Sequence, residues 1–338
     1  MKLLKFLTTF CRWALVVVFI LIVVGVVFEQ YSRWRLEKDI RAGRTFEHIN
    51  GHDMHYVKMG KGNYTVVFES GLASDHFNWR DVQQKLADDS VVTLAYDRSG
   101  FFLSGAGDTA KTNTSISDEL FQLLEKTNCP KPYIVVGHSM GAIYLRSFID
   151  QHKKDVAGIV FVEGAHPLQM KKSAPEVRKA FAQPSPWVVS AGVETGIFRL
   201  IFSKIQVSPE IPMDHPFQTQ FKNYFYKSYD AVFKEAKNDV LNFESAEHSG
   251  KFADIPLTVI MGNPKIWSGA IENEKARQDF ETLVSELHHD MLSWSTDSHL
   301  VTANNSGHIV QVNNADLIVR EIRELLNKVQ HKRDSLPE

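Results

Sequence analysis

A serine in a tight turn is the residue best suited to catalysis in this sequence. Gly137-His138-Ser139-Met140-Gly141 directly follows the apolar run PYIVV and precedes the helical pattern IYLRSFI. A G-x-S-x-G motif between a strand and a helix places its serine at the carboxyl end of the strand. The turn is strained and needs small residues on both sides, here Gly137 and Gly141. The motif therefore predicts Ser139 as a nucleophile, with the amino end of a helix behind it to favour negative charge.

The nucleophile needs a base, because a serine hydroxyl attacks well only when a neighbouring group removes its proton. His308 follows the strand-like run HLVTA after a glycine-containing turn and precedes the final helical pattern. The chain order serine, acid, histidine places the base at this point. We predict His308 as the general base. The alternative is that it is an ordinary surface histidine, one of 14 in the chain.

The acid that orients the histidine has two candidate positions. The strand-like run LTVIM continues into GNPK, with no carboxylate before Glu272, although an acid directly after this strand is the more common arrangement. The preceding apolar run ends at Val162 and is followed at once by Glu163, which puts a carboxylate at the same edge of the sheet. Glu163 is therefore the predicted acid, and Glu272 or Glu274 reaching in from a loop is the alternative.

Acyl transfer also needs backbone N–H groups that stabilise a developing oxyanion. Met140, the residue after the nucleophile, is expected to supply one. The turn after the run TVVF reads ESGLA, where the Leu72 amide is the best second donor and Gly71 allows a close backbone approach. An ordinary glycine turn is the alternative. This chemistry implies no metal and no cofactor.

Short apolar runs alternate with helical patterns along most of the chain, which predicts an α/β fold with a doubly wound, mostly parallel sheet. Asn50-Gly51 between two strand-like runs predicts an opening hairpin. The predicted parallel strands are 65–68, 91–95, 133–136, 158–162, 257–261 and 299–303. The predicted crossover helices are 77–86, 115–126, 140–151, 276–287 and 315–329.

The spacing of the strands breaks once, between Val162 and Leu257. A connection of that length with helical periodicity predicts an inserted helical subdomain, because structureless loops of this length are uncommon. The expected organisation is a membrane anchor at 1–30, a connector at 31–44, a core at 45–164 and 252–330, a helical cap at 165–251 and a tail at 331–338.

The N-terminal segment carries no charge from Trp13 to Phe28. A membrane-spanning helix needs about 20 mostly apolar residues, and the segment reaches this length if Arg12 and Lys5 extend toward the headgroups. We predict a single uncleaved anchor. The alternative is a cleaved signal peptide, although no small-residue cleavage pattern follows Phe28. Basic residues flank both ends, so the side of the membrane stays open.

Composition excludes one class of function. With 38 basic and 40 acidic residues, the net charge is only -2, and no basic surface is expected that would bind nucleic acid. The two cysteines, Cys11 and Cys129, provide neither a disulfide framework nor a cysteine-based metal site.

From Thr45 to Lys328 the motifs together resemble the α/β-hydrolase fold superfamily. The resemblance depends on ESGLAS, YDRSG with a following serine, GHSMG, FVEGAHP and SGH. It implies that Asp97 and Arg98 form a structural turn and that the insertion is a cap over the site. It also implies a serine enzyme, because haloalkane dehalogenases and epoxide hydrolases of this fold carry an aspartate where this chain has Ser139.

Two residues depart from the superfamily's usual pattern. Ser70-Gly71 stands where His-Gly is common, and Glu163 stands where a minority of members carry the acid. Four aromatic residues of the cap fit either an apolar substrate group or ordinary packing. They are Trp187, Phe198, Phe217 and Phe221.

The sequence thus predicts a membrane-anchored serine hydrolase that cleaves an apolar or lipid-like carboxylic ester. Its expected partners are that small-molecule ester and the membrane. An acyltransferase or thioesterase with the same triad is one alternative. A non-catalytic, membrane-tethered binding protein of the same fold is another.

Overall fold

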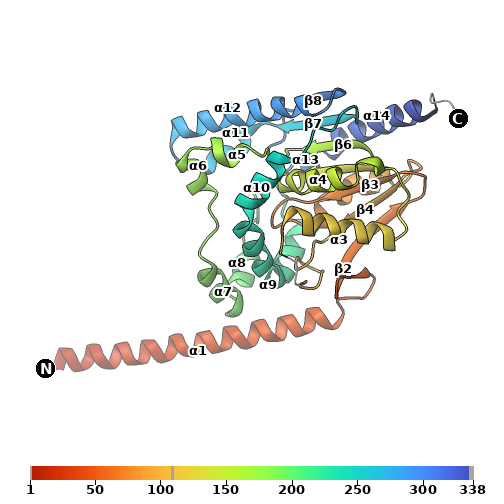
Figure 1. Ribbon diagram of the computed structural model, residues 1–338. Helices are drawn as coiled ribbons and strands as arrows, with labels where there is room; N and C mark the ends of the chain where they lie inside the picture. The colour runs from red at the N-terminus through yellow and green to blue at the C-terminus, as the bar shows by residue number, and fades with distance from the viewer. Residues whose placement is uncertain (1, 108–109, 335–338) are drawn as a thin grey trace.

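The chain forms a sheet of eight strands in a computed structural model that describes residues 2–107 and 110–334 (Figure 1). The strands are β1 (Thr45–Ile49), β2 (His52–Gly60), β3 (Thr65–Glu69), β4 (Val92–Tyr96), β5 (Tyr133–His138), β6 (Val156–Val162), β7 (Leu257–Gly262) and β8 (Ser298–Ala303). Their order is β1-β2-β4-β3-β5-β6-β7-β8. β2 pairs antiparallel with β1 and β4, and the other neighbours are parallel. The predicted doubly wound, mostly parallel sheet is confirmed.

Helices connect the parallel strands and cover both faces of the sheet. The longer ones of the core are α2 (Arg80–Leu86), α3 (Asn113–Lys126), α4 (Met140–Gln151), α12 (Glu274–Met291) and α14 (Ala315–Asp334). Shorter ones are η1 (His76–Trp79), η2 (Lys153–Asp155), α11 (Pro264–Trp267), η3 (Ser268–Ala270), η4 (Leu292–Trp294) and α13 (Val310–Asn313).

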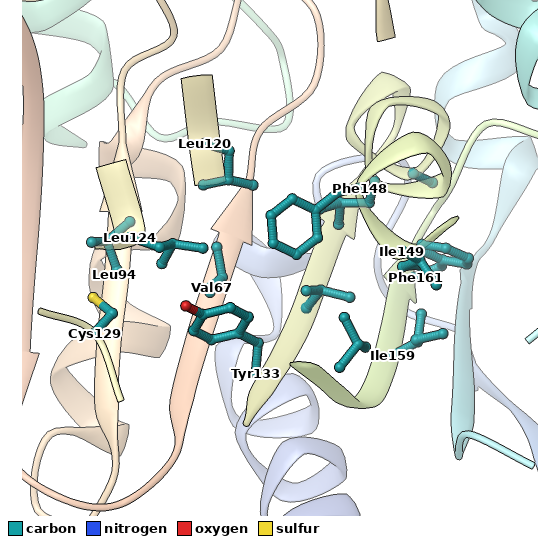
Figure 2. Close-up of a cluster of buried hydrophobic side chains, with 14 of the residues drawn as sticks. Val67, Leu94, Leu120, Leu124, Cys129, Tyr133, Phe148, Ile149, Ile159 and Phe161 are labelled. Atoms are coloured by element: carbon teal, nitrogen blue, oxygen red, sulfur yellow. The ribbon is translucent and has the colours of Figure 1, made fainter. Parts of the chain in front are cut away.

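The core has two layers because side chains alternate between the faces of a strand. Val67 faces a buried cluster that includes Leu120 of α3 and Phe148 of α4 (Figure 2). Its neighbours Val66 and Phe68 belong to a second cluster, built with α2 and α14. Strands that are buried on both faces explain the continuous apolar runs of the sequence. The rigid sheet fixes the positions of the loops at its carboxyl edge.

Six helices lie between β6 and β7, in the region where the sequence predicts an insertion (Figure 1). They are α5 (Gln169–Lys172), α6 (Pro175–Ala180), α7 (Pro186–Glu194), α8 (Ile197–Phe202), α9 (Pro216–Lys237) and α10 (Asp239–His248). Phe217 and Phe221 of α9 are buried against Phe101 and Phe102 of the core. The insertion is therefore packed onto the sheet domain by an aromatic cluster.

The N-terminal segment is one long helix, α1 (Lys2–Lys38), which extends away from the sheet domain (Figure 1). Its stretch from Leu4 to Lys38 is long and apolar enough to cross a membrane. The helix continues past residue 30, where the sequence analysis sets the end of the anchor, and includes most of the expected connector. The apolar stretch and the polar connector are thus one continuous element.

Candidate active site

Ser139 occupies a strained turn between β5 and α4. Its φ of 52° and ψ of -123° lie outside the regions that residues with a side chain normally adopt. Such a backbone costs about 1–3 kcal/mol and persists only where its surroundings hold it. Here the Ser139 amide donates to the Val162 carbonyl at 3.3 Å, and its carbonyl accepts from the Ala165 amide at 2.9 Å. β6 and the loop after it therefore fix the serine at the carboxyl edge of the sheet.

The two glycines of the motif allow α4 to pack closely behind Ser139. A Cβ at position 141 would lie 2.5 Å from the Glu69 carbonyl oxygen of β3. A Cβ at position 137 would lie 2.8 Å from a methyl carbon of Leu145 and 3.0 Å from the Ala142 amide. Any larger residue would push the helix away from the strands and move the serine. Gly137 and Gly141 thus have the close-packing role that the motif predicts.

Glu163 and His308, which are 145 residues apart in the sequence, lie side by side. Glu163 Oε2 is 3.3 Å from His308 Nδ1, and Glu163 Oε1 accepts a hydrogen bond from the Gly262 amide at 2.6 Å. With Nδ1 held by the carboxylate, the Nε2 atom of His308 is the one available for a substrate proton. The alternative acids Glu272 and Glu274 are exposed at the start of α12.

The surroundings keep Glu163 ionised although it is buried. Burial opposes its negative charge, but the hydrogen bond from His308 and the attraction of His288 and His308 outweigh burial and hold its pKa below the ordinary value. His288 Nε2 lies 3.9 Å from Glu163 Oε1. A carboxylate in this state can orient an imidazole and stabilise its charged form.

Ser139, Met140, Leu72 and His308 all line one cavity of about 680 Å³. The predicted nucleophile, base and oxyanion donors therefore open into a single space. The remaining lining comes from the insertion and from α12 and is more apolar than polar, although it also contains Gln169, Ser173, Arg178, Gln183 and Asp239. It includes Ala165, Met170, Val177, Phe181, Phe243 and Phe280.

The turn that carries Leu72 is held from behind by Arg98. Its guanidinium donates to the Ser70 carbonyl at 2.6 Å and to the Gly71 carbonyl at 3.0 Å. The Gly71 carbonyl and the Leu72 amide belong to one trans peptide unit and point in opposite directions. Because Arg98 attracts the carbonyl, the Leu72 N–H is directed away from Arg98. Gly71 also passes close to the nucleophile, since a Cβ there would lie 3.0 Å from Ser139 Cβ.

Arg98 is the centre of a fully buried ionic network. It pairs with Glu69 of β3 at 2.7 Å and with Glu235 of α9 at 2.8 Å. Tyr144 of α4 donates to Glu235 at 3.2 Å, and Tyr96 donates to Glu69. The network therefore joins the turn that carries Leu72, the sheet and the insertion.

Three contacts of the loop that carries His308 could not be predicted from the sequence. The Nε2 atom of His138 lies 2.9 Å from the carbonyl oxygen of His308. Burial lowers the pKa of His138 well below its ordinary value, so its neutral ring donates this hydrogen bond. The Trp267 and His308 rings pack with their centroids 4.8 Å apart. Glu210 accepts a hydrogen bond from the Ile309 amide at 3.2 Å. Of these residues only His138 belongs to a recognised motif, where it occupies the first variable position of G-x-S-x-G.

The aromatic residues expected to contact substrate lie elsewhere. Phe217 and Phe221 are buried in the packing cluster between insertion and core, and Phe198 packs against Phe202 of α8. Trp187 has 74% of its surface exposed. The described residues that line the cavity of Ser139 include none of these four. The three phenylalanines therefore serve in packing rather than in contact with a group in the cavity.

One group of side chains has the composition of a metal site. Among the described residues, His55, His76 and Asp97 bring ligand atoms within 4.8 Å of one another. Both rings already lie at hydrogen-bonding distance from the carboxylate, at 3.2 Å for His55 and 2.9 Å for His76. Burial opposes a charged His76, yet the attraction of Asp97 outweighs it and raises the His76 pKa. An internal ion pair accounts for this cluster, in agreement with the structural role implied for Asp97.

Comparison with known proteins identifies related sequences. A model of the Alpha/beta hydrolase family matches residues 66–321. An AB hydrolase superfamily protein of Gibberella zeae is 25% identical over 298 residues, which cover 78% of this chain and 87% of the relative. The uncharacterized protein YqjL of Bacillus subtilis is 30% identical over 114 residues, 34% of this chain and 44% of that protein.

Solved structures share the fold at low identity. An epoxide hydrolase mutant of Vigna radiata superposes with a TM-score of 0.64 at 16% identity, covering 84% of this chain and 98% of the other. A thermophilic esterase of Thermogutta terrifontis gives a TM-score of 0.58 at 17% identity, covering 85% and 99%. At this identity the structures establish a common fold, and the chemistry must be argued from the site.

Proposed function

We propose that this chain, which belongs to the alpha/beta hydrolase family, is a membrane-anchored serine hydrolase that cleaves a carboxylic ester. Family membership supports hydrolysis in general, and the structural relatives include both esterases and epoxide hydrolases. The observation that carries the more specific proposal is the pairing of Glu163 with His308 at 3.3 Å, together with the position of His308 and Ser139 on the lining of one cavity. An alcohol nucleophile with a neighbouring imidazole and carboxylate is suited to acyl transfer.

In the proposed reaction, the Ser139 hydroxyl oxygen attacks the ester carbonyl carbon while His308 Nε2 takes its proton. The negative charge that forms on the carbonyl oxygen is stabilised by the Met140 and Leu72 amides. His308 then gives the proton to the departing alkoxide, which leaves as the alcohol, and Ser139 carries the acyl group. Water repeats the sequence, so that the acid is released and the serine is restored. Glu163 stabilises the imidazolium in both halves.

The cavity supports an apolar acyl or alcohol group as the preferred substrate part. Its lining is built mainly from aliphatic, methionine and phenylalanine side chains, and binding sites of this composition favour apolar ligands. A helix that is long and apolar enough to cross a membrane adds a reason to expect substrates that partition into lipid. We therefore place the substrate among esters with long acyl chains.

The test is hydrolysis by the full-length chain in detergent micelles, with nitrophenyl acetate, butyrate, octanoate and palmitate and with an aromatic epoxide. We expect the ester rate constant kcat/KM to rise with chain length, the epoxide to stay intact, and Ser139→Ala to abolish turnover. Preference for the acetate would contradict the lipid-like substrate. Hydrolysis of the epoxide that persists in the Ser139→Ala variant would contradict the serine mechanism.

A further inference from the structure

Helices α7 and α8 of the insertion expose an unusual set of large apolar side chains. The set, named here the α7–α8 face, consists of Trp187 and Val188 of α7, Ile197, Leu200 and Ile201 of α8, and Ile205 just after α8. Trp187 is 74% and Leu200 is 59% exposed. Single exposed apolar residues are common on protein surfaces, whereas several on two helices that pack together favour contact with another apolar phase. We propose that the α7–α8 face lies in the surface layer of the same bilayer that α1 crosses.

The position of α1 identifies the bilayer as the occupant. Figure 1 shows α7 and α8 at the end of the insertion that is nearest to α1. Gly25 of α1 packs so closely that a Cβ there would lie 2.4 Å from the Thr195 carbonyl oxygen, between α7 and α8. Gly196, at the same junction, approaches the Gly25 carbonyl oxygen and Phe28. The membrane helix and the α7–α8 face are therefore parts of one surface.

Two ion pairs, one of them buried, link α1 to α7 and α8. Glu29 of α1 receives two hydrogen bonds from Arg199 of α8, at 2.7 and 2.8 Å, and Arg33 pairs with Glu194 of α7 at 3.1 Å. Glu29 is only 2% and Arg199 only 9% exposed, so this pair faces protein rather than lipid, whereas Glu194 is 44% exposed at the edge of the contact. This arrangement suits the membrane boundary, where an unpaired charge is costly. The contact stripe Gly25, Glu29 and Arg33 has the spacing of four that one face of a helix requires.

The contact also lies at the correct depth. A helix rises about 1.5 Å per residue, so Leu4 to Phe28 spans about 36 Å, compared with about 30 Å for the hydrocarbon core. The boundary therefore falls near Gly25 and Phe28, level with the α7–α8 face. Tyr31 and Trp34 follow on α1 and are exposed, as is Trp187 on α7. Aromatic side chains with a polar group are typical of this interfacial layer.

The face is connected to the cavity of Ser139 through a short segment. Phe181, Ala182 and Gln183 line that cavity, and α7 begins only a few residues later, at Pro186. A lipid-like ester that partitions into the bilayer would enter beside the α7–α8 face and reach the serine past this segment. The inference rests on the membrane anchor and the ester substrate of the proposed function, and it names the route between them.

The test places a fluorescent probe at single cysteines of the full-length chain in phosphatidylcholine vesicles that contain nitroxide-labelled lipid. Trp187→Cys and Leu200→Cys probe the face in a Cys11→Ser background, where Cys129 is buried. Val240→Cys is the matched control, because Val240 of α10 is 58% exposed, close to the 59% of Leu200. The native Cys11, labelled in the wild-type chain, reports on the anchor itself.

We expect blue-shifted emission and strong quenching at positions 11, 187 and 200, and neither effect at 240. Quenching at 11 with a water-like signal at 187 and 200 would overturn the proposal while the anchor stands. A water-like signal at 11 would overturn the proposal together with its anchor. This readout needs no catalysis, so it is independent of whether the ester chemistry is correct.

A kinetic test then examines the proposed route. The double variant Trp187→Ser with Leu200→Ser removes exposed side chains that lie outside the cavity lining. We expect its KM for a long-chain ester in vesicles to rise about tenfold, because lost apolar contact weakens access from the bilayer. Its hydrolysis of soluble nitrophenyl butyrate should stay at the wild-type rate. Equal kinetics of variant and wild type on both esters would contradict the route.

Discussion

The carboxyl edge of the sheet and the helical insertion use their side chains in opposite ways. At the sheet edge, Ser139 and Glu163 both have a positive φ and are held by backbone hydrogen bonds from neighbouring strands. In the insertion, α7 and α8 expose Trp187 and Leu200, while Glu194 and Arg199 pair with charged residues of α1. In the proposed function the sheet edge carries the chemistry, and in the proposed membrane contact the insertion governs what reaches Ser139.

The largest effect is expected at the sheet edge. Glu163→Gln keeps the shape of the acid but removes the charge that stabilises the imidazolium of His308. We expect kcat to fall about 10³- to 10⁴-fold, as loss of the acid does in triads of this kind. Steady-state ester hydrolysis measures it. Glu272→Gln is the control, because that exposed carboxylate should leave kcat unchanged. A large loss of kcat in Glu272→Gln with wild-type kcat in Glu163→Gln would identify Glu272 as the acid instead.

A second variant tests the junction between the two regions. Glu235→Gln leaves the buried Arg98 with one charged partner fewer, and breaking a buried pair costs about 3 kcal/mol or more in the free energy of unfolding. Denaturant titration measures the loss. Glu247→Gln removes a partner of the exposed Lys171 pair, and we expect little change there. Equal stability of both variants would show that the Arg98 network does not join insertion and core.

The oxyanion turn is expected to give a smaller effect. A Cβ at Gly71 would press on Ser139 Cβ at 3.0 Å and His138 Nδ1 at 3.1 Å, so Gly71→Ala should displace the turn. Displacement of about 1 Å can reduce turnover about 100-fold. We expect this loss in kcat with little change in KM. Gly269→Ala is the matched control, because nothing lies within 4 Å of its added Cβ. A wild-type kcat in the Gly71→Ala variant would show that the position of this turn does not affect catalysis.

The smallest effect is on the pH dependence of stability. Burial alone would raise the pKa of Glu163. The hydrogen bond from His308 and the attraction of the nearby imidazoles outweigh burial, so the pKa lies below its ordinary value of 4.5. Ionised Glu163 thus stabilises the fold above pH 4.5, and this contribution is lost as the pH falls through the lowered pKa. The difference in unfolding free energy between wild type and Glu163→Gln should narrow in acid. If this difference in unfolding free energy instead widened as the pH falls, the pKa of Glu163 would be raised rather than lowered in the folded state.

The sequence predicted those features that depend on local patterns or on strand order. The placement of Ser139 beside His308 could be predicted because the motif, its strand and its helix are adjacent and because His308 follows the last strand; their catalytic roles stay a prediction. The position of Glu163 followed from the parallel order of β6 and β7, which brings their ends to one edge.

Features that depend on contacts between distant residues could not be predicted. Arg98 and Glu235 are 137 residues apart, and no local pattern relates them. The same holds for Gly25 and Glu29, whose partners lie in α7 and α8. Aromatic residues in the insertion were equally compatible with substrate binding and with packing, because periodicity shows which side of a helix is apolar but not what covers it. Only the assembled fold distinguishes Phe217, which is buried, from Trp187, which is exposed.

The central claim is that Ser139 forms a covalent acyl intermediate. The most direct measurement is intact-mass analysis of the full-length chain in detergent after reaction with a fluorophosphonate, followed by peptide mapping. The account predicts one adduct on Ser139, absent in Ser139→Ala and strongly reduced in His308→Ala. A folded wild-type chain that gains no adduct, or gains it on another residue, would contradict it.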